Sequence, residues 1–183
     1  MFERLFRHRP QVEDAVWLDD AARAAGVPRQ VLTAVEGAAA ALVVVRQGTD
    51  LAPLTRSLAA QPPMVAEDGF ALADLRKALA VPGRIGLTLP DLLARDLRRF
   101  DARHPVHAHV LRRANRRADD DMLLKHLAVW EVASVTFHNA LDDMLLRSHA
   151  PRLKPLLQQL GADPPAPVQS PLISRAIRSA QQD

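Results

Sequence analysis

Cysteine and tyrosine are absent from this chain of 183 residues. The absence of cysteine excludes a disulfide framework, a thiolate metal site and a cysteine nucleophile. Aromatic residues make up only 4% of the chain, which argues against a protein that stacks the bases of single-stranded nucleic acid on its rings. The sequence G-x-x-x-x-G-K-[ST] is also missing, so the chain lacks the phosphate-binding loop of an ATPase.

Long apolar runs are missing as well. No run approaches the roughly 18 to 20 residues that span a bilayer, and residues 1–7 are too polar for the core of a signal peptide. We therefore expect a cytoplasmic protein. Residues 1–12 place Phe2, Leu5 and Phe6 on one helical face, which predicts an arm that docks on the domain. The alternative is a weak anchor for anionic lipid or a partner, peripheral to the inner membrane.

The residues that are present suit one globular domain. Hydrophobic residues make up 48% of the chain, enough for one ordinary core but not for two full domains. The net charge of +3 is a mild excess, so the distribution of charge matters more than its total. We predict an N-terminal arm over residues 1–15, an α/β domain over 16–150 and a C-terminal helical tail over 151–183.

Hydrophobic patterns alternate between strand and helix along the domain. Residues 16–35 have helical spacing interrupted by Gly26-Val27-Pro28, which predicts two short helices joined by a turn. The run Ala41-Leu42-Val43-Val44-Val45 is typical of a strand buried on both faces. Further strands are expected at 63–66, 83–89, 106–111 and 133–137, and helices at 51–60, 72–79, 91–100 and 119–127. This order predicts an α/β fold with an open, mostly parallel sheet of about five strands and helices on both faces.

The end of the chain resembles one family. The matching segments are Ala140-Leu141-Asp142-Asp143-Met144-Leu145, residues 153–161 and Pro171-Leu172-Ile173-Ser174-Arg175-Ala176-Ile177-Arg178-Ser179-Ala180-Gln181. They resemble the end of the second nucleotide-binding lobe of SecA, the motor ATPase of bacterial protein export. The resemblance implies a truncated, RecA-like lobe of the P-loop NTPase superfamily. In that family the helix before the last strand carries arginines that act on the phosphoryl group, whereas residues 122–131 contain no arginine here.

The resemblance and the missing motifs together imply a degenerate, non-catalytic lobe with no cofactor. Our leading hypothesis is an interaction module or accessory protein associated with protein export, whose partner is the export motor or another secretion component. One alternative is an ATPase half-site that a partner chain completes with arginines from 112–117. The other is a nucleic-acid-binding, helicase-like lobe. We favour a protein partner over nucleic acid, because three aspartates directly follow the basic cluster and would neutralise it.

The candidate partner contacts are basic and apolar side chains in two places. They are Arg112, Arg113, Arg116 and Arg117 of the basic cluster, and Leu172, Ile173, Arg175, Ile177 and Arg178 of the last helix. If the last helix is a docking tail, deleting residues 164–183 abolishes partner capture and leaves the core folded.

Other polar groups have simpler explanations. Gly48-Thr49-Asp50 resembles a nucleotide-responsive loop of the motor, but we favour a helix cap, and Thr88 with Asp91 offers only a weak nucleotide contact. His107 and His109 could join His138 or Asp119 in a metal site, but hydrogen-bonded histidines are favoured. The acidic pairs at 142–143 and 119–121 are expected to cap the helices that follow them.

Overall fold

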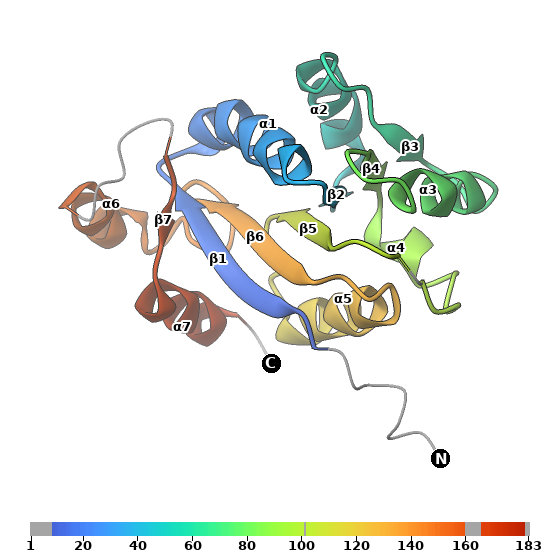
Figure 1. Ribbon diagram of the computed structural model, residues 1–183. Helices are drawn as coiled ribbons and strands as arrows, with labels where there is room; N and C mark the ends of the chain where they lie inside the picture. The colour runs from blue at the N-terminus through green and yellow to red at the C-terminus, as the bar shows by residue number, and fades with distance from the viewer. Residues whose placement is uncertain (1–8, 101, 160–165, 182–183) are drawn as a thin grey trace.

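The protein is built around one seven-stranded sheet (Figure 1). The computed structural model describes residues 9–100, 102–159 and 166–181. The strand order is β3-β4-β2-β5-β6-β1-β7, and every neighbouring pair is parallel except β1 with β7. The strands are β1 (Gln11–Trp17), β2 (Ala40–Val45), β3 (Met64–Ala66), β4 (Ile85–Thr88), β5 (Val106–Leu111), β6 (Ser134–Ala140) and β7 (Val168–Gln169).

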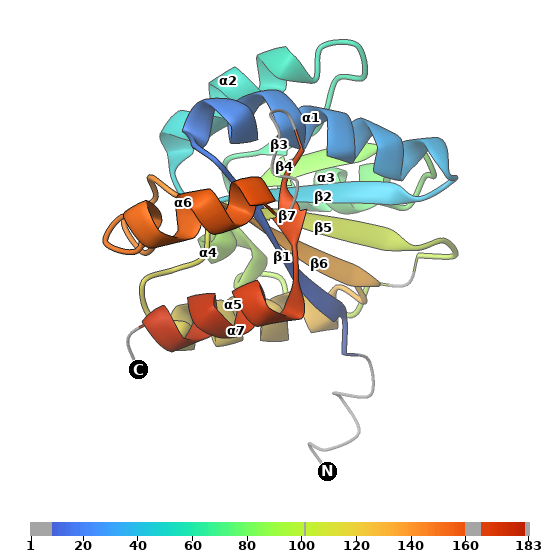
Figure 2. The same cartoon turned by 90° about the vertical axis from the view of Figure 1, so that its left-hand side faces the viewer.

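Helices cover both faces of this sheet (Figure 2). One face is covered by α1 (Asp20–Glu36) and α2 (Leu51–Ser57), which follows the short 3-10 helix η2 (Gly48–Asp50). The other is covered by α3 (Leu72–Leu79), α4 (Pro90–Leu93) and α5 (Arg117–Val129). At the β7 edge lie α6 (Ala150–Gln159) and α7 (Pro171–Ala180). No described helix is long and apolar enough to cross a membrane.

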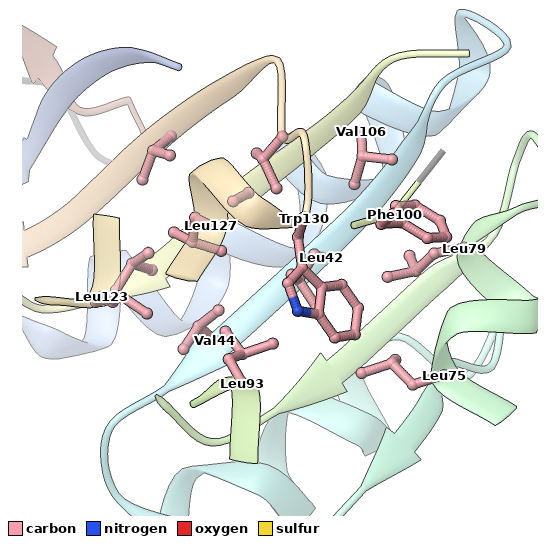
Figure 3. Packing of buried hydrophobic residues seen from close by; sticks show 14 of the residues in the cluster. Leu42, Val44, Leu75, Leu79, Leu93, Phe100, Val106, Leu123, Leu127 and Trp130 are labelled. Atoms are coloured by element: carbon pink, nitrogen blue, oxygen red, sulfur yellow. The ribbon is translucent and has the colours of Figure 1, made fainter. Parts of the chain in front are cut away.

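The interior strand β2 shows why helices pack on both faces of the sheet. All six of its residues are buried, because Leu42 and Val44 face the core under α3, α4 and α5 while Val43 and Val45 face α1 and α2. Figure 3 shows Leu42 and Val44 packed below Trp130, a fully buried side chain from the end of α5. The α/β fold, the mostly parallel sheet and the strand at 41–45 are therefore confirmed.

The start of the chain differs from the prediction. Residues 11–15, which we placed in the arm, form β1 with Val16 and Trp17, and β1 pairs with β6. Residues 20–36 form one helix instead of two, because packing of Val27 and Val31 against the sheet outweighs the interruption at Pro28. The first helix then begins at a side-chain cap, in which Asp19 Oδ1 accepts from the Ala22 N–H at 2.7 Å. The predicted docking of Phe2, Leu5 and Phe6 lies outside the described residues.

The end of the chain also differs. The two residues of β7 pair antiparallel with Ala15 and Val16, so they add a strand that the sequence did not predict. With β1 and β7, the sheet has seven strands instead of about five. The following helix, α7, begins where Ser170 accepts from the Leu172 N–H and buries Ile173 and Ile177 beside Val16. Residues 168–180 are therefore integrated into the fold. The predicted helix end at Gly161 lies outside the described residues.

The remaining elements agree closely with the expected ranges. The helix expected at 72–79 has the same bounds in the structure, and the strand expected at 106–111 does too. By contrast, the helix expected at 91–100 is only one turn, Pro90–Leu93. Phe100 lies beside the Trp130 ring, with ring centroids 5.8 Å apart.

Candidate functional site

The carboxyl ends of the parallel strands meet at one edge of the sheet, which we call the carboxyl edge. Ligands of open α/β sheets bind at this edge, because loops from several strands converge there. A cleft of about 480 Å³ lies at the carboxyl edge between the ends of β2, β5 and β6 and the start of α1. Five arginines and three aspartates line the cleft: Arg23, Arg46, Arg112, Arg113, Arg147, Asp20, Asp142 and Asp143.

Arg113 is a buried side chain that lines this cleft. Its guanidinium binds both carboxylate oxygens of Asp14, at 2.7 and 3.0 Å, and lies 3.8 Å from the centre of the Phe137 ring. Asn139 completes the arrangement, since its Oδ1 accepts from the Arg113 backbone N–H and its Nδ2 donates to Asp14. Burial opposes the charged form of Arg113, but Asp14 and Asp120 outweigh it and raise the pKa. Arg113, which we listed as a partner contact, is 7% exposed and holds the fold together.

Asp120 joins four segments of the chain. Its carboxylate accepts from Arg113 Nη1 at 3.2 Å, from the Ala114 N–H at 3.0 Å and from Gln181 Nε2 at 2.6 Å. It also accepts from Arg46 Nη2, although burial lowers the pKa of that arginine. The prediction that Asp119, Asp120 and Asp121 cap a helix is therefore wrong for Asp120, which is 1% exposed. The helix begins at Arg117 without a side-chain cap.

The ion pairs of Arg112 are longer than the pair of Arg113 with Asp14. Its backbone has a φ of 71°, a conformation that few residues other than glycine adopt. The guanidinium lies 3.3 Å from Asp50, 3.4 Å from Asp143 and 3.9 Å from Asp20, and its Nε has no hydrogen-bond partner among the described residues. Asp50 therefore faces Arg112 and makes no side-chain cap for α2, contrary to the prediction for Gly48-Thr49-Asp50.

Asp142 and Asp143 stabilise the start of α1, not the helix that follows them. Asp142 Oδ2 accepts from the Asp20 N–H at 3.1 Å, and Asp143 Oδ2 accepts from Arg23 Nη1 at 2.6 Å. Burial opposes the charge of Arg23, yet Asp143 and Asp20 together raise its pKa. Residues 141–149 form successive turns before α6, so no helix begins directly after the acidic pair.

One exposed arginine, Arg147, lines the cleft, and two more, Arg116 and Arg117, directly follow the lining residue Asn115. Arg116 and Arg117 lie at the start of α5, and within the described ranges neither forms an ion pair. Arg147 is also exposed, and it donates to the Asp142 carbonyl instead of to a carboxylate. Asn115, which lines the cleft, is also exposed. The expected neutralisation of the basic cluster is therefore found for Arg113, which pairs with Asp120, but not for Arg116 and Arg117.

The candidate contacts in the last helix divide into two groups. Ile173 and Ile177 are buried on the sheet side of α7, so they are not available to a partner. Leu172, Arg175 and Arg178 are exposed on its outer side. Only these three of the five predicted contacts in α7 are therefore available on the surface.

The side chains of His107, His109 and His138 do not line the cleft and lie on the sheet face under α1. Trp17 Nε1 donates to His138 Nδ1 at 3.3 Å, so neutral His138 carries its proton on Nε2 and donates to His109 Nδ1, 3.0 Å away. His107 instead contacts Ser134 Oγ at 2.7 Å. Burial lowers the pKa of His109 from 6.5 to about 4 and that of His138 well below 6.5. No group of three metal-ligating side chains is found in the described part of the chain, and these histidines bond to neighbours as favoured.

Thr88 and Asp91, which offered only a weak nucleotide contact, do not line one hollow. Thr88 is fully buried and donates to the Ala66 carbonyl at 3.2 Å, which closes off its hydroxyl. Asp91 lines a second hollow of about 540 Å³ at the carboxyl edge, together with Arg46, Gly48 and Asp119. Thr88 and Asp91 are therefore not brought together around one ligand.

Sequence reasoning missed the residues that hold the site together. These are Asp14, Arg23, Arg46, Asp120, Asn139 and Gln181. A signal was present for Arg46 and Arg112, since each directly follows a buried strand and parallel strands end at one edge. No comparable signal distinguishes Asp120 from Asp119 and Asp121, because the difference depends on which one points inward.

The comparisons with known proteins identify the fold. No family model matches the chain, and no curated protein does. T4 UvsW matches with a TM-score of 0.55 and 10% identity over 74% of this chain, which spans about a third (33%) of UvsW. The C-terminal domain of a possible DNA helicase from Lactobacillus plantarum WCFS1 matches with a TM-score of 0.44 and 15% identity, over 72% of this chain and 74% of that one.

The likeness to T4 UvsW, with a TM-score of 0.55, supports a RecA-like α/β fold. It therefore supports the predicted resemblance to SecA only in its coarse form, a RecA-like lobe. The comparisons give no support to a role in protein export. The likeness to UvsW, at 10% identity, concerns the fold and not the activity.

Proposed function

We propose that this protein is a non-catalytic RecA-like lobe that binds the phosphate backbone of nucleic acid at its carboxyl edge. This is the alternative that the sequence left open. The observation that carries the proposal is a group of exposed arginines that form no ion pair among the described residues: Arg147, which lines the cleft, and Arg116 and Arg117, which follow the lining residue Asn115. Arginine is the side chain that best matches the geometry of a phosphate.

Arg112 adds a fourth cation inside the cleft. It is not a free cation, since its guanidinium lies 3.3–3.9 Å from three carboxylates, and a phosphate would have to displace one of them. The buried pair of Arg113 and Asp14 serves a different purpose, since it fixes the strand ends from which Arg112 and Asn115 project. The exposed arginines therefore follow a buried, hydrogen-bonded base.

Backbone contacts fit better than base recognition. Among the residues that the structure describes, no aromatic side chain on which a base could stack lines the cleft, and its arginines bind phosphates without distinguishing sequences. We expect binding to single-stranded and double-stranded nucleic acid of any sequence, with an affinity that falls as salt rises.

The test is a binding comparison on the full chain with fluorescent DNA and RNA oligonucleotides at low salt. The double variant Arg116→Ala/Arg117→Ala is expected to bind at least about tenfold more weakly, since each lost phosphate contact removes a charge-assisted interaction. Arg84→Ala is the matched control, because Arg84 is exposed, lacks an ion pair among the described residues and lies at the opposite edge, before β4. Equal losses in the two variants would contradict the proposal.

The two other hypotheses remain predictions. A docking role in protein export rested partly on Ile173 and Ile177, and both are buried. An ATPase half-site would use Arg112 or Arg116 on a nucleotide held by a partner. It predicts ATP hydrolysis by a mixture with a P-loop protein, lost in the Arg116→Ala/Arg117→Ala variant.

A further inference from the structure

An apolar groove lies between α6 and α7, away from the basic cleft. Its volume is about 390 Å³. The floor consists of buried side chains from three elements, Val16, Leu157 and Ile177. Leu153 of α6 forms one wall, and Ala176 and Ala180 of α7 form the other. In Figure 2, α6 and α7 run across the β7 edge of the sheet with β7 between them.

The two helices beside this groove carry charge of one sign. Neither α6 nor α7 contains aspartate or glutamate. Of their cations, Arg152 lines the groove and Lys154 lies outside its lining, whereas Arg175 and Arg178 line a separate hollow with Glu13 and Asp14. His149 also lines the groove, and no carboxylate does so among the described residues. Arg152 has no ion pair there either. An apolar floor with Arg152 at its border therefore favours an occupant with an apolar stripe and an acidic border.

We propose that this groove binds an acidic amphipathic helix of a partner protein. Two neighbouring helices leave a furrow into which the apolar side chains of a third helix fit. On the α7 side the small residues Ala176, Ser179 and Ala180 let another backbone approach closely. Leu156 of α6 is 45% exposed and extends the apolar surface beyond the wall at Leu153.

The groove does not suit nucleic acid. No aromatic ring of the described part of the chain lines it, and its lining offers mainly aliphatic side chains to the occupant. The site is therefore independent of the nucleic-acid contact proposed for the carboxyl edge, and either can fail without the other.

The first test compares two helical peptides by fluorescence anisotropy with the full chain. Both carry leucines along one helical face, and the other positions are mainly glutamate in one peptide and lysine in the matched control. The acidic peptide is expected to bind with a Kd below about 1 mM, which corresponds to about 4 kcal/mol. We expect at least about tenfold weaker binding of the lysine peptide.

Two pairs of variants locate the binding. Ala176→Trp fills the groove from an exposed position of α7 and is expected to abolish binding, whereas Leu172→Trp places the same side chain on α7 outside it. Arg152→Glu is expected to weaken acidic-peptide binding about tenfold or more, and the control Lys154→Glu lies outside the lining and is expected to change it less.

Several results would overturn the proposal. These are equal binding of the two peptides, binding that Ala176→Trp leaves unchanged, or no binding of the acidic peptide up to about 1 mM. Binding of dodecanoate without the peptide would identify a lipid site instead. Concentration-dependent dimers that Ala176→Trp breaks would identify a second copy of this chain.

Discussion

Asp120 turns its carboxylate into the protein at the start of α5, where Arg46, Arg113 and Gln181 converge on it. Removing one partner from a buried ionic network leaves the others unpaired in a poorly solvated place, which costs about 3–5 kcal/mol. We therefore expect Asp120→Ala to lower the free energy of unfolding by that amount. Urea denaturation followed by circular dichroism measures it.

Asp119→Ala is the matched control for that measurement. Asp119 is the preceding residue of the same helix, but it is exposed and makes no side-chain hydrogen bond with another described residue. A surface substitution of this kind changes the free energy of unfolding by about 0.5 kcal/mol or less. If both variants lost the same stability, the network around Asp120 would not have the role assigned to it.

The histidine pair predicts how stability depends on pH. The pKa of His109 is lowered to about 4 in the folded protein from 6.5, because burial opposes its charged form. The unfolded chain therefore binds a proton first as the pH falls, so stability is lost between about pH 6.5 and 4 and the loss then levels off. This lowering corresponds to about 3 kcal/mol for His109. His138, whose pKa is lowered for the same reason, acts in the same direction.

Urea midpoints between pH 7 and 5 test this prediction, above the range in which most carboxylates titrate. The double variant His109→Gln/His138→Gln is expected to show a much flatter dependence on pH than the natural chain. His149→Gln serves as the control, because His149 is exposed. An unchanged pH dependence in the double variant would show that other groups cause it.

At the scale of elements, α3 lies directly against β4. A Cβ added at Gly86 would overlap Cδ1 of Leu75 and lie 3.3 Å from Leu79, both of which are buried leucines of α3. Gly86→Ala is therefore expected to push α3 outward and lower the free energy of unfolding by about 1–3 kcal/mol. Gly69→Ala is the control, since nothing lies within 4 Å of its added Cβ. Thermal unfolding of both variants decides whether this contact is as close as described.

The last helix, α7, packs on β1 through its buried isoleucines. Ile177 is 1% exposed and Leu172 is 73% exposed on the same helix. Ile177→Ala is expected to cost about 2–5 kcal/mol, while Leu172→Ala is expected to be nearly neutral. Similar effects of the two substitutions on chemical denaturation would mean that α7 does not pack on β1.

The same contacts change the expected result of a truncation. Deleting residues 164–183 would uncover Val16 and remove Gln181 from Asp120, so the core would not keep its stability. The sequence-based expectation that the core stays folded after this deletion is therefore not supported by the packing.

Prediction from sequence worked for elements whose side chains share one environment. The strand at 41–45 was predictable because all its residues are apolar, and the helix at 72–79 because its leucines recur at helical spacing. Strand β1 was missed because Glu13 and Asp14 interrupt its apolar residues. Asp14 is tolerated there only because Arg113, which is distant in sequence, binds it. The two-residue β7 is too short to produce a pattern.

At the scale of the whole molecule, the fold brings distant residues to two separate surfaces. Arg46 and Arg112 follow neighbouring parallel strands, so their meeting at the carboxyl edge could be predicted from the sheet alone. The groove between α6 and α7 could not, because it depends on how the last helix returns to β1. We propose nucleic acid as the partner of the charged cleft and an acidic helix as the partner of the apolar groove, so the two proposed contacts use separate surfaces.

The measurement that tests the central claim most directly is the salt dependence of oligonucleotide binding. For single strands, the slope of log K against log salt concentration is about −0.7 for each phosphate that is neutralised. We predict a slope of about −2 or steeper for the natural chain and Arg84→Ala, and a reduction in steepness of about 1.4 for Arg116→Ala/Arg117→Ala. A flat salt dependence, or one that Arg116→Ala/Arg117→Ala does not change, would contradict a phosphate-binding carboxyl edge.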